Sequence, residues 1–225
     1  MRIYLLLFIF VSSLVSTALS QEPQVINRSD NPKYQKDIAI TIDMCPSTNK
    51  MNNELYAYLV RLGRKLHKPL PVAIALSGKW ITKHEKELAK IERMYLDVTW
   101  INHSYSHPVE DDFCDNPKIN FTREVVSTLD LFHKHRLKAS RFFRFPGLRY
   151  NAERLNELNH LGFVALGADA WLAKGQKVKG GSIVLVHGNG NEPQGDRVLI
   201  SYLKQHTKEI LAHKLQIVPV ETYLN

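Results

Sequence analysis

The sequence predicts an α/β fold, a closed or nearly closed (β/α) barrel of about seven strands. Short β-branched segments alternate with amphipathic helical segments along most of the chain, which is typical of βα units and a parallel sheet. Seven strand segments within 225 residues favour a barrel over an open sheet. Neither a glycine-rich phosphate loop after a strand nor a Gly-x-Ser-x-Gly turn occurs, which argues against a dinucleotide-binding fold and an α/β-hydrolase.

Strands are predicted where short apolar runs end at polar residues. In chain order these runs are residues 38–42, 72–76, 97–101, 141–145, 163–166, 182–186 and 215–220. Helices are predicted where apolar side chains recur every three or four positions, as Leu55, Leu59 and Leu62 do. In chain order these segments are residues 53–67, 83–95, 121–137, 152–161 and 198–213.

The composition is that of an ordinary globular protein, with 44% hydrophobic and 23% charged residues. These values exclude a disordered chain, a collagen-like rod and a polytopic membrane protein. The net charge is +8, but the lysines and arginines are scattered, so no nucleic-acid partner is expected. Two cysteines are too few for a disulfide-dense scaffold, and no cluster has zinc-finger spacing.

Residues 1–20 are predicted to be a signal peptide. Arg2 precedes an apolar run over 3–11, and Ala18-Leu19-Ser20 fits a signal-peptidase site before Gln21. An uncleaved membrane anchor is the alternative, although the apolar run is short for a bilayer span. We therefore expect an exported protein, periplasmic or secreted, without stable membrane insertion after cleavage. Residues 21–36 are predicted to be an extended lead-in and 37–225 a single domain, most simply a monomer.

Ionisable residues stand at or just after the ends of several predicted strands. These residues are Asp43, His103, His107, Arg144, Asp169 and His187. In (β/α) barrels the carboxyl ends of the strands meet on the face that carries the active site. The sequence therefore predicts that these side chains converge on one site.

Each of these residues has a catalytic and a structural interpretation. On a helical turn, His103 and His107 would face the same side and chelate a metal such as zinc; the alternative is a pair of surface histidines. Asp43 would act as a general base on water or would cap the following helix. His187 would be the complementary general acid or a buried structural histidine.

Five segments in a fixed order carry a family resemblance. They are Thr41-Ile42-Asp43, His103-Ser104-Tyr105-Ser106-His107, Arg144-Phe145-Pro146-Gly147, Asp169-Ala170-Trp171 and Leu185-Val186-His187. Together they resemble the motifs of the NodB-type polysaccharide deacetylases, carbohydrate esterase family 4. The resemblance implies a distorted (β/α) barrel and a divalent metal, most simply Zn²⁺. It also implies hydrolysis of acetamide, or acetyl ester, bonds in an acetylated polysaccharide, not of peptide bonds.

The resemblance also implies a role for each matching residue. Asp43 corresponds to the catalytic base, Arg144 to the arginine that keeps it charged, and His187 to the general acid. His103 and His107 correspond to the two metal-binding histidines. The remaining assignments are Asp169 as the carboxylate that tunes the acid, and Trp171, Leu185 and Pro146 as substrate-binding residues.

One position departs from the family pattern. The first motif normally has two consecutive aspartates, and Met44 stands where the second, a metal ligand, is expected. A thioether does not replace a carboxylate on zinc. The third protein ligand is therefore open, with four candidates: Asp43, Cys45, Asp111 and Asp112. The alternative function is a catalytically silent glycan-binding protein that keeps the fold without the metal.

Cys45 and Cys114 are predicted to form a disulfide beside the site. Two cysteines in one small exported domain usually pair. The competing interpretation is that Cys45 is a thiolate ligand of the metal.

Overall fold

The computed structural model describes residues 24–109 and 113–224. The predicted signal peptide and the ligand candidates Asp111 and Asp112 lie outside these residues. None of the helices in the described part is long and apolar enough to cross a membrane.

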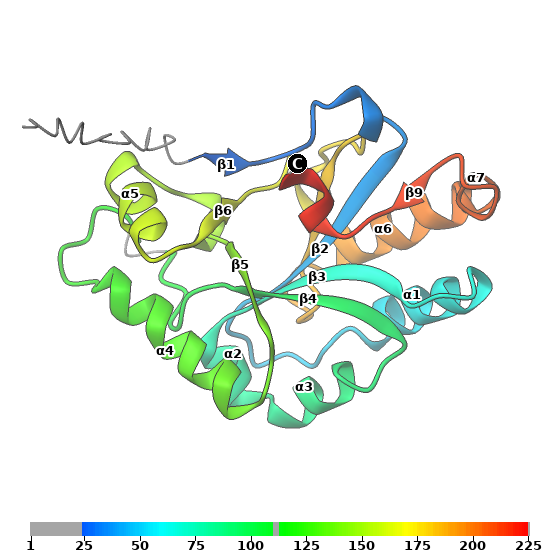
Figure 1. Ribbon diagram of the computed structural model, residues 1–225. Helices are drawn as coiled ribbons and strands as arrows, with labels where there is room; N and C mark the ends of the chain where they lie inside the picture. The colour runs from blue at the N-terminus through cyan, green and yellow to red at the C-terminus, as the bar shows by residue number, and fades with distance from the viewer. Residues whose placement is uncertain (1–23, 110–112, 225) are drawn as a thin grey trace, which may run out of the picture.

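The core of the fold is one curled, parallel sheet (Figure 1). Its nine strands are β1 (Val25–Ile26), β2 (Asp37–Met44), β3 (Leu70–Leu76), β4 (Leu96–Asn102), β5 (Ala139–Phe143), β6 (Val164–Leu166), β7 (Ala170–Trp171), β8 (Ile183–Val186) and β9 (Gln216–Ile217). The order is β1-β6-β5-β4-β3-β2-β8-β7, with β9 added to the start of β2. The predicted α/β barrel of parallel strands is confirmed, but the sheet is a half-barrel because the path of paired strands stays open between β1 and β7.

Helices cover the outer face of the sheet. They are α1 (Asn53–Lys65), α2 (Gly78–Lys83), α3 (Glu85–Ile91), α4 (Phe121–Lys134), α5 (Ala152–His160), α6 (Pro193–Gln205) and α7 (Thr207–Leu211). Side-chain caps fix four of the helix starts, from Asn52, Ser77, Asn120 and Asn151. Each cap accepts a hydrogen bond from a first-turn amide that would otherwise have no partner.

The central strand β2 fixes the position of the site. All of its residues are buried, as expected for a strand covered on both faces. It pairs with β3 on one side and β8 on the other, with Asp43 level with Ala75 and Ile42 level with Val186. The carboxyl ends of β2, β3 and β8 therefore meet at one rim, and the residues that follow them face a common space.

The predicted lead-in is part of the sheet. β1 is an edge strand and pairs with β6, and Arg28 then forms an antiparallel bridge to Ser182, just before β8. The Ser29 amide also donates to the Gly181 carbonyl at 2.8 Å. The segment thus connects the two sides of the open half-barrel. The sequence did not indicate this role, because the segment is polar and its two strand residues are too few to give a periodic pattern.

Two predicted helices are broken and the surface charge is dispersed. The segment predicted as helix over 83–95 contains α3, preceded by a separate α2, and the segment 198–213 is divided at His206 into α6 and α7.

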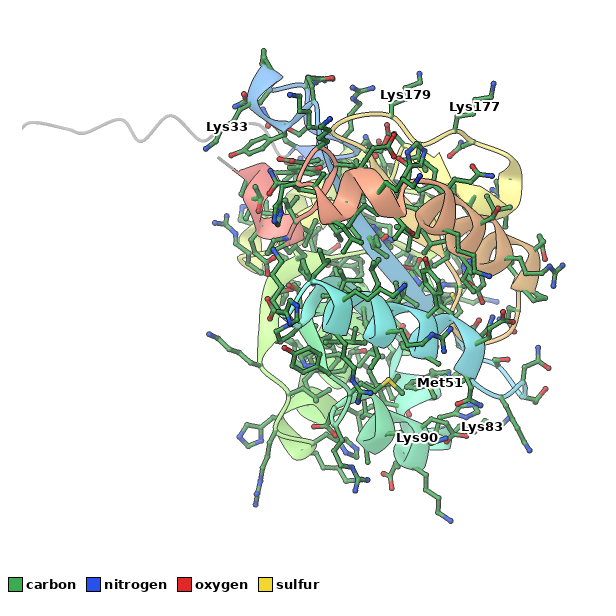
Figure 2. All side chains as sticks on the ribbon, turned by 90° about the vertical axis from the view of Figure 1, so that its right-hand side faces the viewer. Lys33, Met51, Lys83, Lys90, Lys177 and Lys179 are labelled. Atoms are coloured by element: carbon green, nitrogen blue, oxygen red, sulfur yellow. The ribbon has the colours of Figure 1, made fainter. Side chains whose placement is uncertain are left out.

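Figure 2 shows labelled lysines extending from opposite ends of the molecule, with Lys177 and Lys179 at one end and Lys83 and Lys90 at the other. These lysines do not form a single basic patch.

Candidate active site

A pocket of about 550 Å³ opens at the carboxyl ends of β2 and β8. Its lining includes Asp43, Cys45, His107, Trp171, Leu185, His187 and Glu192. The structure thus brings together residues that are far apart in the sequence, at the rim where the strand pattern predicted a site. Pro146 is buried, whereas its neighbours Gly147 and Leu148 line the pocket.

Asp43 is held by a fully buried arginine. Nη1 of Arg144 donates to Asp43 Oδ1 at 2.9 Å and to Thr41 Oγ1 at 2.7 Å. The other donors of Arg144 reach the carbonyls of Leu166, at 3.2 Å, and Gly167, at 2.8 Å. Because its donors are satisfied by β2 and the end of β6, the guanidinium is fixed and gives the buried carboxylate a permanent positive partner.

The two predicted metal-binding histidines lie on an irregular loop, not on a helical turn. Ser104 and His107 adopt positive φ angles of 60° and 53°, which for residues other than glycine are uncommon. Glu124 of α4 holds the loop by accepting from the Ser106 amide and hydroxyl, both at 2.7 Å. These turns bring the Nε2 atoms of His103 and His107 to 3.0 Å from each other. The predicted convergence of the pair is therefore achieved through backbone strain rather than helical spacing.

The sulfur of Cys45 lies close to the two imidazoles. Cys45 Sγ lies 3.6 Å from His103 Nε2, and one donor atom from each of Cys45, His103 and His107 falls within 4.8 Å of the others. Burial lowers the pKa of His103 and of His107 to about 3, so both are neutral near pH 7 and offer lone pairs. A set of two imidazoles and one thiol has the donor chemistry that zinc prefers, so the residues present fit a divalent metal.

His187 faces the same pocket in a different environment. Its Nδ1 lies 2.8 Å from Glu192 Oε2, and Trp171 Nε1 donates to the same oxygen at 2.8 Å. Burial alone would lower the pKa of His187, but the contact with Glu192 and the charge of Asp43 outweigh it and raise that pKa. The contact with His187 in turn lowers the pKa of Glu192. The contact with Glu192 therefore favours the protonated form of His187, which can donate a proton.

The carboxylate beside His187 is Glu192, not Asp169. Asp169 precedes β7, which pairs in parallel with β8, so it lies level with the start of β8. There its oxygens accept from the Ile183 amide and the Ser182 hydroxyl, both at 3.0 Å. His187 follows the far end of β8, about 13 Å further along the strand. The sequence prediction placed Asp169 at the end of a strand, whereas it precedes the start of a short strand that the pattern did not indicate.

Met44 points away from the site. It is fully buried in the core with α1 residues, and its Sδ accepts from the Tyr56 hydroxyl at 3.2 Å.

The predicted disulfide between Cys45 and Cys114 is not formed in the structure. Cys114 belongs to an aromatic cluster with Phe113, and its Sγ donates to the Arg149 carbonyl at 3.3 Å.

Two site residues were missed by the sequence interpretation. Glu192 is five residues after His187 in a polar loop, and Glu124 lies in the first turn of α4. Neither has a local pattern that marks it. Trp171 and Leu185, by contrast, line the pocket as the resemblance implies.

Several solved structures share this fold. PdaA of Bacillus subtilis, a family 4 carbohydrate esterase, matches with a TM-score of 0.68 at 15% identity, over 89% of this chain and 84% of that one. The peptidoglycan N-acetylglucosamine deacetylase Bc1960 matches with a TM-score of 0.63 at 17% identity, over 88% and 92%. A mutant of BA3943, a CE4 family pseudoenzyme from Bacillus anthracis, has restored enzymatic activity and matches with a TM-score of 0.66 at 16% identity, over 91% and 72%.

These structural neighbours therefore include both enzymes and a protein described as a pseudoenzyme, and at such identities they establish the fold alone. The family model described as polysaccharide deacetylase matches residues 30–166, more than half of the chain. The matched segment contains Asp43, both clustered histidines and Arg144. The chain belongs to the polysaccharide deacetylase family.

Proposed function

We propose that this protein is a metal-dependent hydrolase that removes acetyl groups from N-acetylated polysaccharide. The observation that carries the proposal is the grouping of a carboxylate held by Arg144, a cluster of metal-donor side chains, and a histidine whose Nδ1 contacts Glu192. Hydrolysis of an amide requires a base for the water, an electrophile for the carbonyl and an acid for the leaving amine. The three parts of the pocket match these three needs.

Asp43 is the proposed base. Its Oδ1 is occupied by Arg144, and its Oδ2 faces the histidine cluster, 3.5 Å from His103 Nε2. The guanidinium fixes the carboxylate through Oδ1, and a carboxylate oxygen facing the cluster can accept a proton from water. Asp43 therefore orients and deprotonates the attacking water from the side of the pocket where a metal would lie.

His187 is the proposed acid, and Glu192 is its positioning residue. Glu192 contacts Nδ1 of His187, so the protonated Nε2 is the nitrogen left to face the pocket. The leaving amine needs this proton, because an amide anion is too basic to depart unprotonated. Trp171 donates to the same carboxylate and so keeps Glu192 in place.

His103 and His107 would hold a divalent metal, which we propose is zinc. A metal at this position supplies a Lewis acid for the acetyl carbonyl and lowers the pKa of a bound water. The His103 Nδ1 atom lies 2.8 Å from the Arg144 carbonyl. This contact makes Nδ1 the protonated nitrogen and leaves Nε2 free for the metal, the arrangement common among metal-bound histidines.

The proposed substrate is a polymer of N-acetylated sugars. The pocket is open, and Trp171 and Leu185 supply apolar surface for an acetyl methyl group and a sugar face. The match to a peptidoglycan N-acetylglucosamine deacetylase supports this class of substrate. A polymer of this kind lies outside the cytoplasm, so we also propose that residues 1–20 direct export and that the protein acts in the periplasm or after secretion.

Acetate release from a panel of acetylated glycans tests the proposal. The purified protein, loaded with Zn²⁺, should release acetate from at least one N-acetylated polymer, and a chelator or Asp43→Asn should abolish release. The asparagine side chain is isosteric with the carboxylate but cannot accept the proton from water. A zinc-loaded protein that binds the glycans and releases no acetate would contradict the proposal and favour the silent glycan-binding alternative.

A further inference from the structure

The family pattern loses a metal ligand at position 44, and the described residues offer few replacements. The Met44 side chain is directed into the core toward Tyr56, so it cannot reach the histidines. Asp43 lies near His103, but Arg144 holds its Oδ1, and its carboxylate does not belong to the group of donors that lie within 4.8 Å of one another. That group consists of the two histidines and Cys45.

The donor distances fit one tetrahedral ion. With zinc–sulfur and zinc–nitrogen bonds of about 2.3 and 2.0–2.1 Å, tetrahedral angles place sulfur about 3.5 Å from nitrogen and the two nitrogens about 3.3 Å apart. In the structure, Cys45 Sγ is 3.6 Å from His103 Nε2, and the two Nε2 atoms are 3.0 Å apart. The remaining pair, Cys45 Sγ and a donor nitrogen of His107, lies within 4.8 Å, so side-chain shifts can bring all three donors onto one ion.

The backbone around Cys45 is held in place. Asn189, fully buried after β8, donates from Nδ2 to the Cys45 carbonyl at 2.8 Å. The Ser77 amide and hydroxyl donate to the preceding carbonyl, that of Met44, at 3.2 and 3.0 Å. These bonds from two different loops fix the position from which Sγ projects toward His103. The sulfur therefore belongs to a preformed site.

We propose that Cys45 supplies the third protein ligand of the metal as a thiolate, in place of the carboxylate lost at position 44. This assignment rests on the proposed metal-dependent function and deepens it. On binding, a metal–sulfur bond forms, the sulfur–hydrogen bond breaks, and the proton leaves to solvent. The thiolate carries the same single negative charge as the missing carboxylate, so the charge of the metal site is preserved. A thiolate also favours Zn²⁺ or Co²⁺ over Mg²⁺ and Ca²⁺.

Cobalt spectroscopy tests the sulfur ligand without relying on activity. The metal-free full-length protein is titrated with Co²⁺, and the near-ultraviolet thiolate-to-cobalt charge-transfer band is recorded; zinc affinity is measured by competition with a chelator. Cys45→Ser removes the sulfur, Cys45→Asp replaces it with a carboxylate, and Cys114→Ser is the matched control at the other buried cysteine. Circular dichroism confirms that each variant is folded.

Wild type and Cys114→Ser should show the charge-transfer band, and both Cys45 variants should lack it. Loss of one of the ligands should weaken zinc binding in Cys45→Ser on the order of 100-fold, and Cys45→Asp should recover part of this loss. A wild type without the band, or a Cys45→Ser protein that keeps wild-type zinc affinity, would overturn the assignment. Acetate release is scored separately: a sulfur-bound metal without acetate release would sustain the ligand and reject the proposed function.

Discussion

Two buried histidines of the candidate site, His103 and His187, have opposite pKa shifts. Burial lowers the pKa of His103 to about 3, although the contact of its Nδ1 with the Arg144 carbonyl acts in the opposite direction. His187 is almost as buried, but its Nδ1 contacts the carboxylate of Glu192, and its pKa rises. The same residue type therefore has the charged form disfavoured at position 103 and favoured at position 187.

The difference comes from the carboxylate of Glu192 at Nδ1 of His187, which has no counterpart at Nδ1 of His103. Burial lowers the pKa of both imidazoles, and the contact with Glu192 together with the charge of Asp43 outweighs that effect at His187. Pairs of titratable groups whose environments push their pKa values apart are typical of acid–base active sites. In this protein Glu192 makes the difference, and the sequence motifs did not mark that residue.

The largest expected effect comes from removing the neutral histidines. His103→Ala or His107→Ala should each abolish metal binding and lower acetate release on the order of 10³-fold, because the metal contributes several kcal/mol to the transition state. Metal content and acetate release measure both effects. His133→Ala, at an exposed position on α4, is the matched control and should change neither. Stoichiometric metal in both site variants would show that this side of the pocket is not a metal site.

The second prediction concerns Met44→Asp, which restores the aspartate of the family pattern in the sequence. In the structure, however, the side chain at position 44 points into the core. An aspartate there would put a carboxylate into the core beside Tyr56. We expect Met44→Asp to reduce the free energy of unfolding by about 3–5 kcal/mol, with no gain in metal affinity. Chemical denaturation and zinc competition measure the two quantities.

Met44→Leu is the control, because a swap that conserves volume should cost less than about 1.5 kcal/mol. A stable Met44→Asp protein that binds zinc more tightly than wild type would contradict the structure. It would mean that the strand end can turn residue 44 toward the histidines, and that Cys45 does not complete the shell.

The strand pattern predicted the position of the site because buried strands can be recognised from local runs of apolar residues. Continuous apolar runs at β2 and β8 marked covered strands, and parallel strands align their carboxyl ends, so Asp43 and His187 had to converge. The connection between the two sides of the open half-barrel was not predictable in this way. It depends on β1, two residues long, and on the bridge from Arg28 to Ser182, which no periodicity indicates.

The partners within the site were less predictable than its position. The family motif assigned Asp169 as the carboxylate partner of His187. In the structure Asp169 precedes the two-residue strand β7, whose pairing places it beside the start of β8, whereas His187 follows the end of β8. Glu192 takes that place through a loop contact that only the fold creates. Cys45 was one of several open ligands, and its selection required knowing that Met44 turns into the core.

The third prediction uses a second carboxylate close to His187. Asp196 of α6 is buried; Asn52 Nδ2 donates to one of its oxygens at 2.6 Å, and the other has no partner in the described part of the chain. Burial raises its pKa to about 6, the opposite of the lowered pKa of Glu192. The folded state therefore holds the proton more strongly, and this stabilisation is lost as the pH rises from about 4 through about 6.

Asp196→Asn should remove this dependence. Relative to the variant, wild type should lose on the order of 2 kcal/mol of unfolding free energy between pH 4 and pH 7, measured by denaturation at a series of pH values. Parallel stability curves for the two proteins would contradict the prediction. They would mean that burial does not raise the pKa of Asp196 in the folded protein.

The smallest expected effect tests the comparison most directly. If Glu192 raises the pKa of His187, Glu192→Gln should lower that pKa and reduce acetate release about tenfold, because the acid is less fully protonated and less well oriented. Activity that needs protonated His187 falls as the pH rises through its pKa. The basic limb of the kcat/KM profile should therefore move to lower pH in the variant. Asp169→Asn should leave that limb in place, since its carboxylate bonds Ser182 and Ile183 at the other end of β8. A shift with Asp169→Asn and none with Glu192→Gln would return the role to the residue that the sequence motif indicated.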